Sequence, residues 1–363
     1  MSDSSFSSIP ATMKAVVLMG PNRLEMKHIP VASPGPADVL IRVESCAICR
    51  SDLGMMEKPF PGQSPYGQTI LGHEYSGTVV ALGETVDEFK IGDRVTVEAH
   101  LGCGRCRNCR LGDYTSCLNY GNREKGHRCN GHVTPGAYAQ YVVNHINTVH
   151  KIPDSISFDE ASLVTNLGCV LYGIENLGGY IAGQRVLVIG AGPLGLAAAA
   201  AANALSADKV YLSDVLAERL AAGEKIGVQR TINASTEDPL EAILDDTKGI
   251  GVNYAIESSG TQAGLDLAVK ATCRNGKILM LSIAHHPLTV DLENLSLNDK
   301  DIITNRGESR ANVGRAVSLL ARGLVNLKPL ITHGFPLDEY ETALSVFRER
   351  KDGAIKVILH PQA

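Results

Sequence analysis

Roughly the first 160 residues contain short runs of apolar side chains separated by glycine and proline. Such runs are typical of β-strands, because side chains alternate between the two faces of a strand and turn residues end it. The runs are KAVVL (14–18), VLIRV (39–43), YSGTVVAL (75–82), DRVTVEAH (93–100) and AYAQYVV (137–143). We therefore expect a compact body, all-β or α+β, with long functional loops.

From residue 185 the pattern changes to apolar strand-like runs that alternate with helical segments. The expected strands are 185–190, 209–214, 230–233, 252–258 and 276–283, with helices ending near 205, 226, 247 and 272 between them. This alternation predicts a parallel sheet with right-handed crossovers and helices on both faces. Beyond residue 306, helical stretches at 314–323 and 339–349 precede a last strand at 355–360.

The composition indicates an ordered protein of about two domains, since 363 residues with 44% hydrophobic content can build a sizeable core. Lys and Arg number 34 against 39 Asp and Glu, a net charge of −5, which argues against a nucleic-acid or anionic-membrane partner. The Ser-rich beginning has no signal-peptide pattern, and the apolar run at 194–205 is too short to span a bilayer. We expect a cytoplasmic protein.

Four of the nine cysteines are crowded into residues 103–117. They are Cys103, Cys106, Cys109 and Cys117. Thiolates at this spacing can converge on one ion, and four protein ligands leave no open position, so a structural zinc is expected. The neighbouring Arg105, Arg107 and Arg110 are expected to lower the thiol pKa values. A disulfide pair or an iron–sulfur cluster are the alternatives.

A glycine loop follows the strand RVLVIG and opens an alanine-rich helix. It consists of Gly190, Ala191, Gly192, Pro193, Leu194 and Gly195. The first glycine permits the tight turn, the second lets the backbone approach a pyrophosphate, and the third lets the helix pack closely on the strand. The loop predicts a dinucleotide site, with a plain glycine-rich turn as the alternative.

Asp214 ends the second strand of this region, 24 positions after Gly190. A carboxylate there accepts hydrogen bonds from a ribose 2′-hydroxyl and repels a 2′-phosphate, which favours NAD over NADP. The alternative is that Asp214 caps the next helix. Arg219 is either an adenosine contact or a solvated helix residue.

A second candidate metal site combines Cys49 with His73, 24 residues apart, each at the end of a strand-like run. This pair suits a catalytic zinc with an open coordination position. Asp52 or Glu74 could orient the histidine. The alternatives are that Cys49 is a buried small apolar residue and that His73 is a hydrogen-bonded loop histidine.

The order of CRSD (49–52), GHE (72–74), the cysteine cluster and GAGPLG (190–195) resembles the zinc-dependent medium-chain alcohol and polyol dehydrogenases. The resemblance implies an α/β chain with a GroES-like, β-rich catalytic domain and an inserted Rossmann domain with a doubly wound parallel sheet. The expected boundaries are 1–165 and 306–363 for the catalytic domain and 166–305 for the NAD-binding domain. The family also implies homodimers or homotetramers.

The resemblance assigns roles to individual residues. Cys49 and His73 match the family's first two catalytic zinc ligands, and Glu74 matches a conditional ligand. Ser51 matches the hydroxyl that takes a proton from the substrate, and Arg50 matches a position that can touch the cofactor pyrophosphate.

Two positions depart from the family pattern. The third zinc ligand, a Cys or a Glu in the family, falls at or near Asn166, and Cys169 lies three residues further on. A histidine that relays the proton in some relatives is replaced by Gly54, so the proton would leave through water or the cofactor ribose. The segment 122–132 either lines the substrate cleft or is a solvated loop. Cys129 within it is taken as an ordinary thiol.

The expected function is an NAD-linked, zinc-dependent oxidoreductase that interconverts a small-molecule alcohol with its ketone or aldehyde by hydride transfer. The alcohol would be a secondary alcohol, a polyol or a sugar alcohol. One alternative is a zinc-independent reductase of activated alkenes or quinones from the same superfamily. Another is a non-catalytic protein that binds a dinucleotide.

Overall fold

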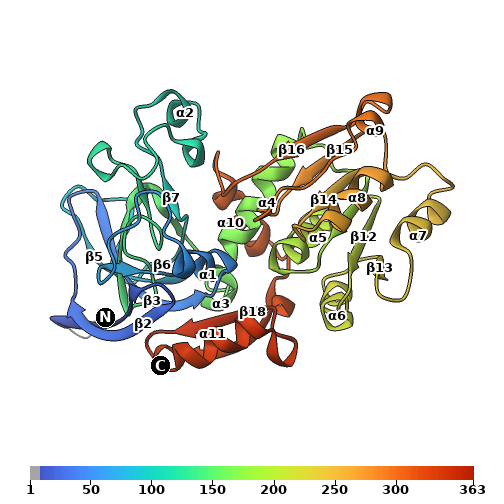
Figure 1. Cartoon of the computed structure of the whole chain (residues 1–363). Helices are drawn as coiled ribbons and strands as arrows, with labels where there is room; N and C mark the ends of the chain where they lie inside the picture. The colour runs from blue at the N-terminus through green and yellow to red at the C-terminus, as the bar shows by residue number, and fades with distance from the viewer. Residues whose placement is uncertain (1–8) are drawn as a thin grey trace. The chain divides into compact units, whose positions relative to one another are not determined.

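A computed structural model describes residues 9–363 of the chain. Its contacts divide into two compact units, shown in Figure 1. The first contains the chain up to Thr165 together with Ile331–Ala363, and the second is Asn166–Leu330.

The second boundary between the two units lies between residues 330 and 331, whereas the sequence analysis expected it between residues 305 and 306. Helix α10 (Asn312–Ala321) explains the difference, because it is bonded to helix α4 (Val164–Asn176) of the second unit. Asn312 Nδ2 donates to Glu175 Oε2 at 2.8 Å, and Arg315 Nη1 lies 2.9 Å from the same oxygen. The chain therefore returns to the first unit only after this helix.

The first unit is built on a seven-stranded sheet with the order β10-β6-β5-β3-β18-β17, in which β9 also pairs with β3. Its strands are β3 (Asp38–Ala47), β5 (Glu74–Leu82), β6 (Arg94–Val97), β9 (Tyr141–His145), β10 (Val149–Lys151), β17 (Ile331–Pro336) and β18 (Lys356–His360). Strand β18 lies between β3, to which it is antiparallel, and β17, to which it is parallel. The late part of the chain thereby completes a sheet begun by the early part (Figure 1).

Smaller elements complete the first unit. A three-stranded sheet contains β1 (Thr12–Gly20), β2 (Arg23–Pro30) and β4 (Thr69–Ile70), and a ladder pairs β7 (His100–Leu101) with β8 (Arg128–Cys129). The helices are α1 (Arg50–Glu57), α2 (Arg107–Arg110), α3 (Phe158–Ser162) and α11 (Tyr340–Glu349). One core cluster contains residues of both the three-stranded and the seven-stranded sheet, and it includes the buried residues Val16, Ile41, Val79 and Val357. The predicted β-rich body is confirmed.

The second unit contains a six-stranded sheet in which every neighbouring pair is parallel, with the order β13-β12-β11-β14-β15-β16. The strands are β11 (Arg185–Ile189), β12 (Lys209–Asp214), β13 (Arg230–Asn233), β14 (Val252–Glu257), β15 (Thr272–Met280) and β16 (Asp301–Thr304). Between them run α5 (Pro193–Ala204), α6 (Ala217–Lys225), α7 (Pro239–Asp246), α8 (Gln262–Ala271) and α9 (Leu292–Leu297). This strand order, 3-2-1-4-5-6, is that of the doubly wound dinucleotide-binding fold and confirms the predicted parallel sheet.

Within residues 9–363, no helix is both long enough and apolar enough to cross a membrane.

Candidate functional site

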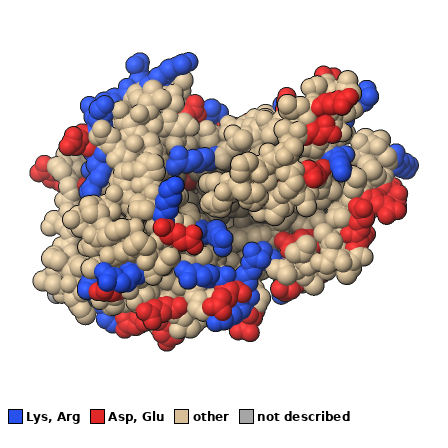
Figure 2. All heavy atoms as spheres, in the orientation of Figure 1, with Lys and Arg blue, Asp and Glu red and all other residues tan. Residues whose placement is uncertain are grey.

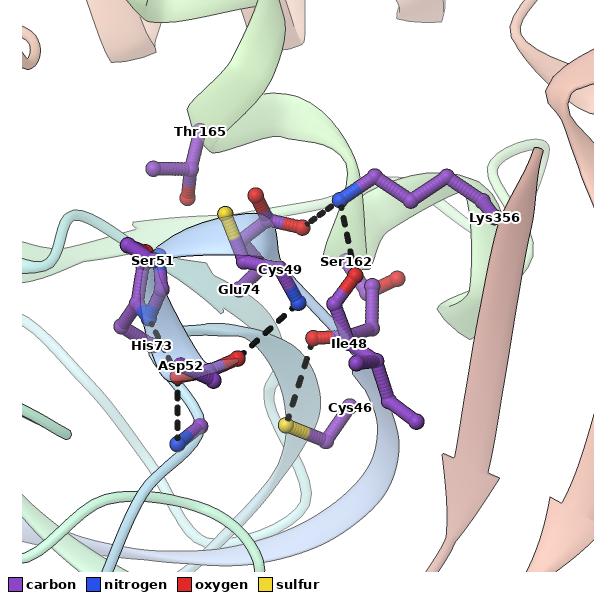
Figure 3. Close-up of polar contacts among 12 residues, drawn as sticks. Cys46, Ile48, Cys49, Ser51, Asp52, His73, Glu74, Ser162, Thr165 and Lys356 are labelled. Carbon is purple, nitrogen blue, oxygen red and sulfur yellow. Dashed lines mark hydrogen bonds and ion pairs between the residues drawn. The ribbon is translucent and has the colours of Figure 1, made fainter. Parts of the chain in front are cut away.

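Cys49, His73 and Glu74 converge in the first unit, as Figure 3 shows, with their ligand atoms within 4.8 Å of one another. Cys49 is the residue that caps the N-terminus of α1, and His73 and Glu74 stand at the start of β5. The Cys49 amide donates to Asp52 Oδ2 at 2.9 Å, which fixes the backbone where α1 begins. We call these three residues the Cys49 centre.

Asp52 orients the imidazole ring of His73 through the Nδ1 atom of the ring. Its Oδ1 lies 3.2 Å from His73 Nδ1, and its Oδ2 accepts a hydrogen bond from Tyr138 Oη at 3.0 Å. Burial opposes ionisation of Asp52, but the neighbouring His73 and the donated hydrogen bonds outweigh it and lower the pKa of this carboxyl. With Nδ1 engaged, Nε2 is the ring nitrogen left for a ligand, and Ser51 Oγ lies 3.3 Å from it.

Glu74 is paired with Lys356 of β18, and both residues are 1% exposed. Lys356 Nζ also donates to the Ile48 carbonyl at 3.3 Å (Figure 3). Burial tends to lower the pKa of Lys356, but the Glu74 carboxylate outweighs this and raises it, so the amine stays charged. Sequence reasoning missed Lys356, although a lysine inside the apolar strand IKVILH is a signal of a buried ion pair.

The four-cysteine lobe, residues 103–117, also brings its sulfurs together within 4.8 Å. Cys106 Sγ lies 3.4 Å from Cys109 Sγ, which lies 4.0 Å from Cys103 Sγ. None of the cysteines in residues 9–363 forms a disulfide, so the structure does not support the disulfide alternative.

Backbone and side-chain amides lower the pKa of two of the four lobe thiols, whereas burial raises the pKa of Cys109 and Cys117. Burial opposes ionisation of Cys103, but the amide of Asn119 and the backbone amides of Arg105 and Cys106 lower its pKa to about 6. Cys106 likewise has a lowered pKa, mainly because the Cys109 and Leu118 amides donate to it.

The expectation that the lobe's arginines lower the thiol pKa values needs correction. Arg105, Arg107 and Arg110 are exposed to solvent, and the effect comes instead from the N–H groups of the loop backbone and of Asn119. Figure 2 shows Lys and Arg side chains gathered at the upper left, over the segment labelled α2 in Figure 1. Their charges therefore face water, where screening weakens their influence on the sulfurs.

The glycine loop of the second unit has the expected stereochemistry. Gly190 has a φ of +92°, and a Cβ on Gly195 would lie 1.8 Å from the Gly190 carbonyl oxygen. A Cβ on Gly192 would meet nothing within 4 Å, so the loop presents open space where α5 begins with Pro193 and Leu194. A phosphate group fits such a position, because helix N-terminal amides point toward it.

Asp214 is bonded to the glycine loop and to the next turn. Its Oδ2 accepts from the Ala191 amide at 2.6 Å, and its Oδ1 accepts from the Leu216 amide at 2.9 Å. Each carboxylate oxygen keeps acceptor capacity for a further donor. Arg219 is half-buried in the first turn of α6, and Arg50, in the first turn of α1, is exposed.

The structure shows the surroundings of the positions at which the sequence departs from the family pattern. Asn166 is buried in α4 at the start of the second unit. Cys169 Sγ lies 3.4 Å from Glu308 Oε2, so this thiol has a partner within its own unit. A Cβ on Gly54 would meet nothing within 4 Å.

Comparisons with known proteins agree with this architecture. Residues 35–154 match the model of the alcohol dehydrogenase GroES-like domain, and residues 193–322 match that of the zinc-binding dehydrogenases. The chain is 32% identical to a sorbitol dehydrogenase of Bacillus subtilis, over 98% of this chain and 99% of the relative. It is also 32% identical to an L-threonine 3-dehydrogenase of Pectobacterium atrosepticum, over 96% of this chain and 94% of the relative.

A solved structure has the same fold. It is a putative zinc-binding dehydrogenase from Sinorhizobium meliloti bound to NADP, with a TM-score of 0.88, 26% identity and coverage of 97% of this chain and 100% of that one. The chain therefore belongs to the zinc-dependent medium-chain alcohol/polyol dehydrogenase family, and the predicted GroES-like and Rossmann-type architecture is confirmed. It is an alcohol/polyol oxidoreductase, which argues against the non-catalytic alternative.

Proposed function

We propose that this enzyme interconverts a secondary alcohol, polyol or sugar alcohol with its ketone or aldehyde, using zinc at the Cys49 centre and NAD at the glycine loop. The observation that carries the proposal is the convergence of Cys49, His73 and Glu74, with Asp52 bonded behind the histidine. A thiolate, an imidazole and a carboxylate are the donors that zinc takes in catalytic sites.

The residues of the Cys49 centre have distinct roles in this proposal. Cys49 and His73 hold the ion, and the Asp52 carboxylate fixes the ring so that Nε2 points at it. Glu74 supplies a third donor. The positive charge of Lys356 partly offsets the negative charge of this buried carboxylate. When bound, zinc supplies Lewis acidity that lowers the pKa of a substrate hydroxyl. Asn166, a weak neutral donor, is then not required in the ligand set.

Ser51 is the proposed proton acceptor. Its hydroxyl lies 3.3 Å from His73 Nε2, so it stands beside the point where a substrate oxygen would be held. Gly54 has no side chain that could continue a relay, so the proton leaves through water or the cofactor ribose.

We infer NAD rather than NADP from Asp214. Its oxygens already accept two backbone amides, and their remaining lone pairs suit ribose hydroxyls, whereas a 2′-phosphate would meet a negative charge. Gly190, Gly192 and Gly195 with Pro193 and Leu194 form the pyrophosphate cradle. Arg50 and Arg219 are the proposed cofactor contacts outside this cradle. NAD held there would supply the hydride acceptor for oxidation of the alcohol.

The test is steady-state turnover with NAD against a panel of polyols, amino alcohols and simple secondary alcohols. Cys49→Ala or His73→Ala should lower kcat/KM by about 10³-fold or more, because several kcal/mol of transition-state stabilisation are removed. Cys273→Ser, which changes a thiol remote in sequence from both centres, is the matched control and should leave turnover unchanged. Wild-type turnover in the Cys49→Ala variant would show that the proposal is wrong.

The lobe is proposed as a structural zinc site, because four cysteines fill the coordination sphere and leave no position for substrate. We also propose a cytoplasmic homodimer or homotetramer. Zinc analysis of the purified protein tests the structural site, and light scattering tests the oligomeric state.

A further inference from the structure

A third group of metal-ligating side chains converges in the first unit, apart from the Cys49 centre and the lobe. His100, Cys129 and His132 are 7%, 0% and 7% exposed, and their ligand atoms lie within 4.8 Å of one another. Neither the alcohol dehydrogenase chemistry proposed above nor the lobe uses any of them. We call this group the His100 cluster.

The backbone brings these residues together in two steps. His100 of β7 lies directly opposite Cys129 of β8 in an antiparallel pair, and opposed side chains in such a pair project from the same face. After β8 the chain turns tightly, since the Cys129 carbonyl accepts hydrogen bonds from the amides of His132 at 3.0 Å and Val133 at 2.7 Å. The turn returns the His132 ring to the thiol, with Cys129 Sγ 3.2 Å from His132 Nδ1.

The donor chemistry of the cluster selects for a particular class of ion. Two imidazoles and one thiol suit zinc, whereas Ca²⁺ and Mg²⁺ prefer oxygen ligands. Bonds of about 2.3 Å to sulfur and about 2.0 Å to nitrogen place tetrahedral ligands about 3.5 Å apart. The Cys129–His132 pair is already near this separation at 3.2 Å, and the ligand atoms of all three residues lie within 4.8 Å of one another.

We propose that His100, Cys129 and His132 form a third zinc site, whose fourth position is taken by water. The His132 ring lies beside the Cys49 centre, with its centroid 4.5 Å from that of His73 and 6.1 Å from that of His100. An ion there would join the β7–β8 ladder to the loop that packs against His73. The inference does not depend on the enzyme's substrate or cofactor.

The test is the zinc content of the full-length protein, purified with zinc and dialysed, in a matched set of Cys→Ser variants. Wild type should hold three zinc ions per chain. Cys49→Ser, Cys109→Ser and Cys129→Ser should each lose one, and Cys273→Ser should lose none. Since each variant removes a ligand from a different site, loss of dehydrogenase activity in Cys49→Ser can be told apart from loss of the third ion in Cys129→Ser.

Cys129 is fully buried, so its serine variant could fold poorly. His100→Gln then takes its place, with circular dichroism to show that the fold is retained, and the same loss of one ion is expected. The proposal is overturned if wild type and a folded His100-cluster variant hold the same amount of zinc, because the three side chains would then be only a hydrogen-bonded group.

Discussion

The lobe and the Cys49 centre assemble their ligands in opposite ways. The lobe draws its four ligands from residues 103–117, most of them partly exposed, in a loop that contains one short α-helix and one turn of 3-10 helix. The Cys49 centre joins a helix N-terminus to a strand of the main sheet, and its supporting residues include Lys356 from the other end of the chain. A site made from one short segment depends on its metal for order, whereas a site made by a sheet is held by the fold.

The largest expected effect tests whether the sheet holds the Cys49 centre. Lys356→Met removes the ammonium that pairs with the buried Glu74 carboxylate, which should lower the free energy of unfolding by about 3–5 kcal/mol. Urea unfolding measures it, and adding Glu74→Gln should recover part of the loss. Lys14→Met removes a 2.6 Å ion pair with Asp338 that is 37% and 54% exposed, and it serves as the control. Equal losses in both lysine variants would contradict the distinction.

The next largest effect is a local loss of structure that should be confined to the lobe. Cys106→Ser removes a zinc ligand, so the loop opens more often and tryptic cleavage after the exposed Arg105, Arg107 or Arg110 should become at least about tenfold faster. Mass spectrometry of the fragments locates the cuts, and Cys273→Ser should cleave at the wild-type rate. If cleavage instead accelerated equally throughout the first unit, the lobe would not be an independent local structure.

The smallest effect concerns a pair outside both metal sites, His360 of β18 and Asp159 of α3, whose Nε2 and Oδ1 atoms lie 2.9 Å apart. The hydrogen bond to Asp159 raises the pKa of His360 above its ordinary 6.5. Burial opposes ionisation of Asp159, but His360 and Ser45 outweigh it and lower the pKa of this carboxyl. The pair is charged on both sides only between these two pKa values.

The His360 contribution is fully present below pH of about 6.5 and is lost as pH rises through its raised folded pKa, while the Asp159 contribution is lost in acid. His360→Gln should therefore cost under about 1 kcal/mol near pH 6, since both side chains are about one-third exposed, and less at pH 9. Urea unfolding at the two pH values measures it. A cost that grows toward pH 9 would contradict the assignment, and zinc content should not change.

The same contrast explains what the sequence could predict. The cysteine spacing and GAGPLG encode local geometry, so the lobe and the strand–loop–helix at Gly190 were foreseeable. Strand β16, with the sequence DIIT, was missed. Lys356 and the His100 cluster escaped because their partners meet only through strand pairing, and Cys129 therefore looked like an ordinary thiol. In the segment 122–132, His127, Cys129 and His132 are buried, so it is not a wholly solvated loop.

The insertion of β18 between β3 and β17 has a consequence for biosynthesis. Ile48, at the end of β3, and Lys356 are 308 residues apart in sequence, and a ribosome adding about 5–20 residues per second takes about 15–60 s to cover that distance. During this interval the Cys46–Ala47 end of β3 lacks its β18 neighbour, and Glu74 lacks the Lys356 ammonium. The sheet of the first unit can therefore be completed only when translation is nearly finished.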